Sequence, residues 1–344
     1  MDQTLQWDPP SGWSRIRTVD MHTGGEPLRI LVDGLPEIKG STILEKRRYF
    51  RDRLDFIRTG AMFEPRGHAD MYGAILTEPV TGDGDFGVIF MHNQGYSTMC
   101  GHAIIALTKF VLDTGFIDRK GEEVTLQIDG PAGRIISTGY REKGEVDRVV
   151  FRNVPSFVLI PDARVEVHGL GRINLTVAYG GAFYAFVDAI ALGIDLGRQN
   201  ASGLISLGRE IKNEVARHFD IEHPFESELG FLYGTIFTGK PEKAGRHSRN
   251  VCIFADGELD RSATGTGVSA RAAIHYQQGE IKQGEWLEIE SIIGTTMKVR
   301  VADLIPYGPH QAIIPEIEGS AHFTGRSDFW FDPDDPLKNG FILR

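Results

Sequence analysis

The sequence predicts a protein of two similar domains, each of mixed α/β (α+β) type. The chain has 344 residues, a length that suits two domains better than one. Short apolar runs rich in β-branched residues, which predict strands, alternate with stretches of helical periodicity. A segment of the first half recurs, with matching residue types, in the second half. These three observations together predict two pseudo-symmetric halves.

The predicted strands are apolar runs bounded by turn-forming residues. They cover residues 73–80, 86–93, 123–130, 148–160, 173–181, 182–188, 250–257 and 296–305. Helices are predicted at 41–60 and 205–219, because apolar residues such as Phe50, Leu54 and Ile57 fall near helical spacing. The polar and basic stretch 239–250 predicts an exposed loop.

The internal repeat aligns residues 88–130 with the second half at a shift of 164 residues, which takes position 100 to position 264. Cys100 then falls on Thr264, and Gly101 falls on Gly265. Each half is predicted to contain strands, a turn, an Ala-rich helix closed by a glycine, and further strands.

Composition excludes several classes of partner. The formal net charge of -10 disfavours nucleic acid and anionic membranes. No run of about 18 apolar residues predicts a transmembrane helix, and the first residues lack the features of a signal peptide. With only two cysteines, a disulfide scaffold is excluded and a cytoplasmic location is expected. A small molecule is the expected partner. A homodimer is compatible with the sequence, although no feature points to one.

Cys100 stands at the predicted start of the first repeated helix. Unpaired N–H groups and the helix dipole at such a position lower the pKa of a thiol. His102 follows two residues later and could orient or deprotonate this thiol. The alternative is that Cys100 is a small core residue, since cysteines before apolar helices often are.

The second helix start lies in the stretch DRSATGTG, residues 260–267. Its glycines leave backbone N–H groups uncovered, which favours an anion, but it lacks the lysine of a phosphate-binding loop. Two such starts facing each other would hold one carboxylate. The backbone groups in contact would be those of Gly101, His102, Gly265 and Thr266.

This arrangement favours removal of a proton from the carbon next to a carboxylate. Helix dipoles and N–H donors would stabilise the enolate-like charge while the Cys100 thiolate takes the proton. Thr264, on the opposite side, is too weak an acid to rest as a second base at neutral pH. The chemistry is therefore predicted to be one-sided.

Several motifs resemble the proline racemase family, which is related in fold to diaminopimelate epimerase. They are VDMHTGGEPLRI, EPRGHADMYGA, NQGYSTMCGHAIIAL, AYGGAFYAFVD, DRSATGTGVSAR and HFTGRSDFWFDPDDPLKNGF, and they span nearly the whole chain. Proline racemases and 4-hydroxyproline 2-epimerases have a Pro-Cys pair where this chain has Ala263 and Thr264. The threonine resembles the trans-3-hydroxy-L-proline dehydratase branch, which removes water without a redox or metal cofactor. Its enamine product tautomerises to Δ1-pyrroline-2-carboxylate.

The resemblance implies a fold in which each domain wraps a barrel-like sheet around a central helix, here about 101–114 and 265–278, with the active site in the interdomain cleft. The implied domains are 1–158, joined by a returning segment 320–344, and 159–319. Cys100 would be the catalytic base, with Thr264 at the place of the second racemase cysteine. Asp260 would lie near the ring nitrogen of the substrate.

Stereochemistry adds a constraint. In trans-3-hydroxy-L-proline the hydroxyl lies on the same ring face as the Cα hydrogen, so it would depart on the side of Cys100. The Cys100 thiol, His102 or water could then protonate it. No acid on the Thr264 side is required.

Other residues and functions stay as alternatives. Cys252 is predicted to be inert core, His22 and His68 are weaker site-wall candidates, and Arg66 is more readily explained by structural ion pairing. Phe183, Tyr184 and Phe231 are expected in the core or cleft wall. No histidine or cysteine spacing predicts a metal site. The competing functions are a one-cysteine racemase or epimerase, a cysteine hydrolase, and a carboxylate-binding protein without catalysis.

Overall fold

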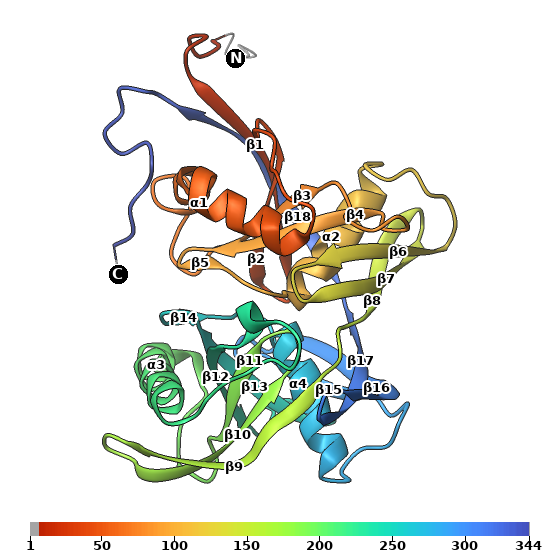
Figure 1. Cartoon of the computed structure of the whole chain (residues 1–344), viewed down its shortest axis with the longest axis vertical. Helices are drawn as coiled ribbons and strands as arrows, with labels where there is room; N and C mark the ends of the chain where they lie inside the picture. Colours follow the sequence, from red (N-terminus) through yellow and green to blue (C-terminus); the bar gives the residue numbers. More distant parts are fainter. Residues whose placement is uncertain (1–6, 344) are drawn as a thin grey trace.

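The structure is a computed structural model that describes residues 7–343. It has two lobes, one containing β1–β8 and the other β9–β17 (Figure 1). Each lobe combines a curved sheet with two α-helices. The predicted mixed α/β class with two similar halves is confirmed.

The first lobe is built on a sheet of mixed direction. β1 (Ser14–Thr23) pairs with β2 (Glu26–Asp33), β2 runs parallel to β3 (Tyr72–Thr77), and β3 pairs antiparallel with β4 (Phe86–His92). β4 runs parallel to β6 (Glu123–Gly130), followed by antiparallel β7 (Gly133–Glu142) and β8 (Glu145–Arg152). The remaining elements are α1 (Ile43–Met62), β5 (Gly95–Tyr96) and α2 (Gly101–Asp113).

The second lobe repeats this order. β10 (Gly171–Tyr179), β11 (Phe183–Asp188), β12 (Leu232–Gly239), β13 (Ser248–Phe254), β15 (Leu287–Glu290), β16 (Thr296–Tyr307) and β17 (His310–Gly319) correspond to β1, β2, β3, β4, β6, β7 and β8. The parallel pairs are again the second with the third and the fourth with the fifth. The other elements are η1 (Arg198–Asn200), α3 (Ala201–His218), η2 (Ser227–Leu229), β14 (Glu258–Leu259) and α4 (Gly265–Gln277). The repeat inferred from the sequence is therefore a repeat of topology.

One further strand pairs antiparallel with the first matched strand of each lobe. β9 (Phe157–Val167) pairs with β10 at the edge of the second lobe, and β18 (Ala321–Phe331) returns to pair along the whole of β1 (Figure 1). β8 and β17 hydrogen-bond to each other and so join the two sheets. We propose that the two domains are 1–158 with 320–344, and 159–319, with the first boundary falling just inside the start of β9.

The central helices α2 and α4 are buried over nearly their full length. Their sequences explain this, because α2 is apolar on all sides and α4 consists mostly of small residues. Side chains of both helices belong to one continuous apolar core. The outer helices are one-sided: α1 buries Phe50, Leu54 and Ile57, as the periodicity predicts.

Two local predictions need correction. The run 148–160 was predicted as one strand but divides into β8 and β9, with a break at 153–156. The predicted exposed loop 239–250 ends early, because Ser248, Arg249 and Asn250 are buried residues of β13. Arg249 is stabilised there by the buried carboxylate of Glu290. A basic residue paired inside the fold cannot be told from a solvated one by local composition. Within residues 7–343, no helix has the length and apolar character needed to cross a membrane.

Candidate active site

The two central helices begin against each other. Cys100 is the N-cap of α2 and Thr264 is the N-cap of α4. A Cβ atom added to Gly101 would lie 2.5 Å from the Cα atom of Gly265, and one added to Gly265 would lie equally close to Gly101. Only glycine therefore allows this approach, which aligns the positive ends of two helix dipoles on one point.

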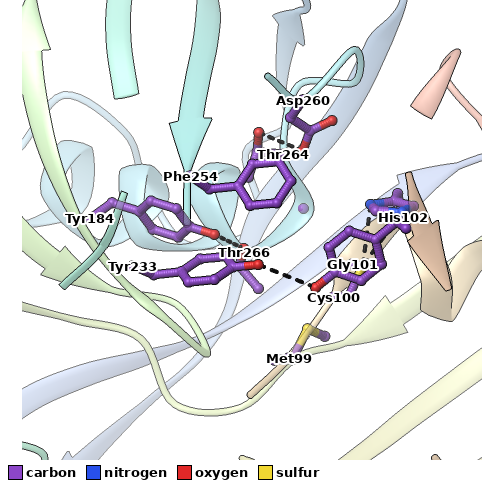
Figure 2. Close-up of a pocket in the computed structure, with 12 residues that line it drawn as sticks. Met99, Cys100, Gly101, His102, Tyr184, Tyr233, Phe254, Asp260, Thr264 and Thr266 are labelled. Carbon is purple, nitrogen blue, oxygen red and sulfur yellow. Dashed lines mark hydrogen bonds between the residues drawn. The ribbon is translucent and has the colours of Figure 1, made fainter. Parts of the chain in front are cut away.

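A small pocket opens at this contact (Figure 2). The first lobe contributes Tyr72, Met99, Cys100, Gly101 and His102 to its lining. The second lobe contributes Tyr184, Tyr233, Phe254, Asp260, Thr264, Gly265 and Thr266. All seven residues singled out from the sequence thus meet in one pocket between the lobes.

Cys100 is almost completely buried, and its Sγ atom lies 3.2 Å from Nδ1 of His102 (Figure 2). Burial raises the pKa of this thiol well above its ordinary value, and the negative charge of Asp260 acts in the same direction. A hydrogen bond from the Ala103 N–H at the start of α2 acts to lower the pKa. The expectation of a lowered thiol pKa is therefore wrong, because desolvation outweighs the helix start.

His102 is held as a neutral imidazole. Burial lowers its pKa to about 4, against the opposing effects of Asp260 and of a hydrogen bond to the backbone of Pro27. The Thr23 hydroxyl, at the end of β1, donates to the His102 carbonyl at 2.8 Å. The turn between β1 and β2 therefore positions the first turn of α2.

Thr264 has its hydroxyl engaged within the protein. It donates to Oδ2 of Asp260 at 2.8 Å (Figure 2). The Thr264 N–H donates to the Ser262 hydroxyl at 3.1 Å. The backbone of Thr264 has φ 67°, an unfavourable value for a β-branched residue. Asp260 is itself buried and accepts the Ser262 N–H at 2.7 Å. This network fixes the start of α4.

Glu26 is a buried carboxyl group beside the pocket that sequence reasoning missed. Its Oε2 accepts the Arg261 N–H at 2.7 Å, whereas Oε1 is buried without a hydrogen-bond partner. Burial raises the pKa of Glu26 well above its ordinary value, and Asp260 raises it further. Only its place in the motif HTGGEP, next to the candidate His22, could have drawn attention to it.

Tyrosine hydroxyls form the rest of the polar lining. Tyr184 bonds to the Thr266 hydroxyl at 2.7 Å (Figure 2). Tyr72 donates to the Ser97 hydroxyl, and its own oxygen lies 3.5 Å from that of Tyr233. Sequence reasoning expected Tyr184 in the core or cleft wall but did not single out Tyr72 or Tyr233, since isolated tyrosines in strands are common core residues.

The weaker candidates lie away from the pocket lining. His22 packs against His322, with ring centroids 5.2 Å apart. Arg66 donates to the backbone carbonyls of Trp330 and Lys338, a structural role. His68 contacts the carbonyl of Ala69.

Three further residues from the sequence analysis have core or surface positions. Cys252 is fully buried in β13 within the apolar core, next to Thr264. Phe183 is also a core residue, whereas Phe231 is exposed. Within residues 7–343, no group of three or more His, Cys, Asp or Glu side chains is arranged to hold a metal ion.

Residues 18–342 match the family described as proline racemase. The chain belongs to the proline racemase family. The resemblance stated from the sequence motifs is thereby confirmed.

Relatives and solved structures within this family resemble the whole chain. A trans-3-hydroxy-L-proline dehydratase of Colwellia psychrerythraea is 46% identical over 342 residues, covering 98% of this chain and 96% of that protein. A human protein of the same name is 43% identical over 335 residues, covering 96% and 95%. The crystal structure of a hydroxyproline epimerase from Agrobacterium vitis with bound trans-4-hydroxy-L-proline superposes with a TM-score of 0.90 at 28% identity, covering 96% of each chain.

Proposed function

We propose that this protein is a hydro-lyase that dehydrates trans-3-hydroxy-L-proline to Δ1-pyrroline-2-carboxylate without a cofactor. The names of relatives at 46% and 43% identity support the substrate. The observation that carries the proposal is chemical: the pocket lining holds one thiol, that of Cys100, together with a threonine hydroxyl that already donates to Asp260. A base on one side only suits elimination better than racemisation.

The paired helix starts are the proposed carboxylate site. The N–H groups of Gly101 and His102 from α2, and of Gly265 and Thr266 from α4, are the unpaired donors of two first turns. A carboxylate bound there has its negative charge stabilised by both dipoles. The same donors stabilise the additional charge that develops when the Cα proton leaves.

Cys100 is the proposed base. Burial raises the pKa of the thiol, so substrate binding must favour the thiolate. The substrate supplies a positive charge at its imino nitrogen, which an adjacent thiolate attracts. Asp260 is the proposed partner of that nitrogen, since its buried carboxylate is the acidic group in the pocket lining. The neutral His102 imidazole orients the sulfur at 3.2 Å.

Loss of water is the proposed outcome of the carbanion. Return of a proton from the opposite face would give the D-isomer. Thr264 is a poor donor for that step because its hydroxyl already donates to Asp260 and is a weaker acid than a thiol. The 3-hydroxyl departs on the Cys100 side instead. Cytoplasmic location is part of this proposal and is favoured by the two free, buried thiols.

Incubation of the purified protein with trans-3-hydroxy-L-proline, without added cofactor, tests the proposal. Pyrroline-2-carboxylate should form with the wild type, and Cys100→Ala should lose at least about 1000-fold of this activity. L-Proline and trans-4-hydroxy-L-proline should give no measurable D-configured product. Rapid formation of D-product without dehydration would instead identify a racemase or epimerase. Binding without turnover would identify a carboxylate-binding protein.

A further inference from the structure

Elimination requires an acid that protonates the departing hydroxyl, and few side chains of the pocket lining can act as that acid. The hydroxyl leaves on the same side as the Cα proton, which is the side of the first lobe. That lobe contributes five residues to the pocket, and only Cys100, His102 and Tyr72 among them have a side-chain proton to donate. Cys100 is occupied by the proton that it has just removed from Cα.

His102 is poorly suited to this role. Burial lowers its pKa to about 4, so the imidazole carries one ring proton at neutral pH. The ring hydrogen-bonds to the Pro27 backbone, and its Nδ1 and Nε2 atoms lie 3.2 Å and 3.6 Å from the Cys100 sulfur, so the imidazole is already engaged by the backbone and by the thiol. His102 is therefore better explained as a group that orients Cys100.

Tyr72 is the remaining proton donor that the first lobe contributes to the pocket lining. It comes from β3, lies edge-on to the His102 ring with centroids 4.8 Å apart, and is 2% exposed. Its side chain lines the same pocket as Cys100, and hydrogen bonding by its hydroxyl acts to lower the pKa of the thiol. The hydroxyl is further connected to Ser97 and, at 3.5 Å, to the Tyr233 hydroxyl. Tyr233 belongs to the second lobe, and its hydroxyl contacts that of Tyr72.

We propose that Tyr72 is a catalytic residue that protonates the leaving hydroxyl and then recovers the proton from Cys100. This inference rests on the proposed dehydration. The Cys100 thiolate takes the Cα proton, and the electron pair of that bond forms the double bond to C3 as the C3–O bond breaks. The Tyr72 proton goes to the departing oxygen, which leaves as water. The Tyr72 phenolate then removes the proton from the Cys100 thiol, so that both residues return to their starting state.

The test separates proton removal from loss of the hydroxyl. In deuterated water, L-proline exchanges its Cα hydrogen through Cys100 alone because it has no leaving group. Tyr72→Phe should therefore lose at least about 100-fold in dehydration of trans-3-hydroxy-L-proline while Cα exchange of L-proline changes by less than about tenfold. Mass spectrometry measures both reactions on the same samples.

A substrate with a different leaving group sharpens the test. Fluoride needs less protonation than hydroxide in order to depart, so Tyr72→Phe should release fluoride from trans-3-fluoro-L-proline within about tenfold of the wild-type rate. Cys100→Ala should lose both reactions. The matched control is Tyr179→Phe, which removes another buried tyrosine hydroxyl, one without a hydrogen-bond partner and in the separate core cluster of the second lobe. Thermal unfolding of both variants shows whether each is folded.

Two outcomes would overturn the assignment of Tyr72. One is dehydration by Tyr72→Phe at close to the wild-type rate. The other is an equal loss of exchange, dehydration and fluoride release, which would make Tyr72 a residue that only positions the thiolate. If the wild type itself exchanges L-proline but does not dehydrate the 3-hydroxy substrate, the proposed function fails instead, and this is seen before any variant is compared.

Discussion

Cys100 experiences two opposing effects, and their balance gives a measurable pH profile. Desolvation raises the pKa of the thiol, while the N–H groups at the start of α2 act to lower it. Desolvation has the larger effect on the pKa of the thiol. The thiolate is therefore a minor species at neutral pH, and the fraction of reactive enzyme increases as the pH rises.

The first prediction follows from this direction. Because kcat/KM reports ionisations of the free enzyme, it should rise by about tenfold per pH unit from pH 6 and still be rising near pH 9. The alkylation rate of Cys100, identified by mass spectrometry apart from Cys252, should follow the same curve. A plateau in both measurements below about pH 8 would contradict a raised thiol pKa.

Glu26 gives a second prediction, about stability. Its pKa is raised by burial and by Asp260, so the folded protein holds a proton that the unfolded chain releases above pH 4 to 5. The stability that this protonated group contributes is complete below the unfolded pKa and is lost as the pH rises toward the folded pKa. Glu26→Gln keeps the shape without titrating. Relative to the wild type it should therefore gain up to about 1.4 kcal/mol in free energy of unfolding per pH unit above about pH 5.

Urea unfolding of both proteins at several values between about pH 5 and pH 8 measures this difference. Glu37→Gln, which makes the same substitution at an exposed position, is a suitable control. A constant difference for Glu26→Gln would show that Glu26 is ionised in the folded protein.

At the scale of elements, the site depends on how closely α2 and α4 approach. Gly101→Ala places a methyl group 2.5 Å from Gly265, where backbone has to shift. We expect a loss of about 1–3 kcal/mol in free energy of unfolding and a larger loss of kcat/KM, since the N–H donors of both helices are displaced. Gly82→Ala is the control, because a Cβ there meets nothing within 4 Å. Wild-type activity in Gly101→Ala would show that the helix contact is not needed.

The boundaries of the predicted elements were partly correct because helix and strand periodicity is a local property, but strands such as β7, β12 and β17 were not among those predicted. α1 and α3 begin and end within four residues of the predicted positions. The break between β8 and β9 was missed, since an apolar run does not reveal where a chain passes from one lobe to the other. The burial of Arg249 was missed for a related reason: its partner Glu290 lies in β15, on another part of the chain.

At the scale of the whole molecule, the two lobes are physically continuous. β8 and β17 hydrogen-bond across the boundary, and α2 and α4 share one apolar core. Buried polar contacts add to this, including that of Glu258 in β14 with His92 in β4 at 3.2 Å. Neither lobe therefore buries its central helix alone.

The fourth prediction is that the chain unfolds in a single transition despite its two-domain form. Trp286 reports from the second lobe, whereas Trp7, Trp13 and Trp330, which pack together, report from the first. A Trp286→Phe variant follows the first lobe by fluorescence, and a variant that keeps only Trp286 follows the second. The urea midpoints of the two variants should coincide with each other and with the midpoint from far-UV circular dichroism. Separate midpoints would show that the lobes unfold independently.

The sequence by itself determined the repeated topology and the opposition of Cys100 to Thr264, because spacing and repetition are encoded along the chain. It also indicated Asp260 and the glycines that let two helix starts meet. Only the tertiary structure decided the ionisation of Cys100 and brought Tyr72 and Glu26 beside the pocket. The physical reason is that desolvation and electrostatic fields depend on all the groups packed around an atom, and at this site those groups come from strands of both lobes, far apart in the sequence.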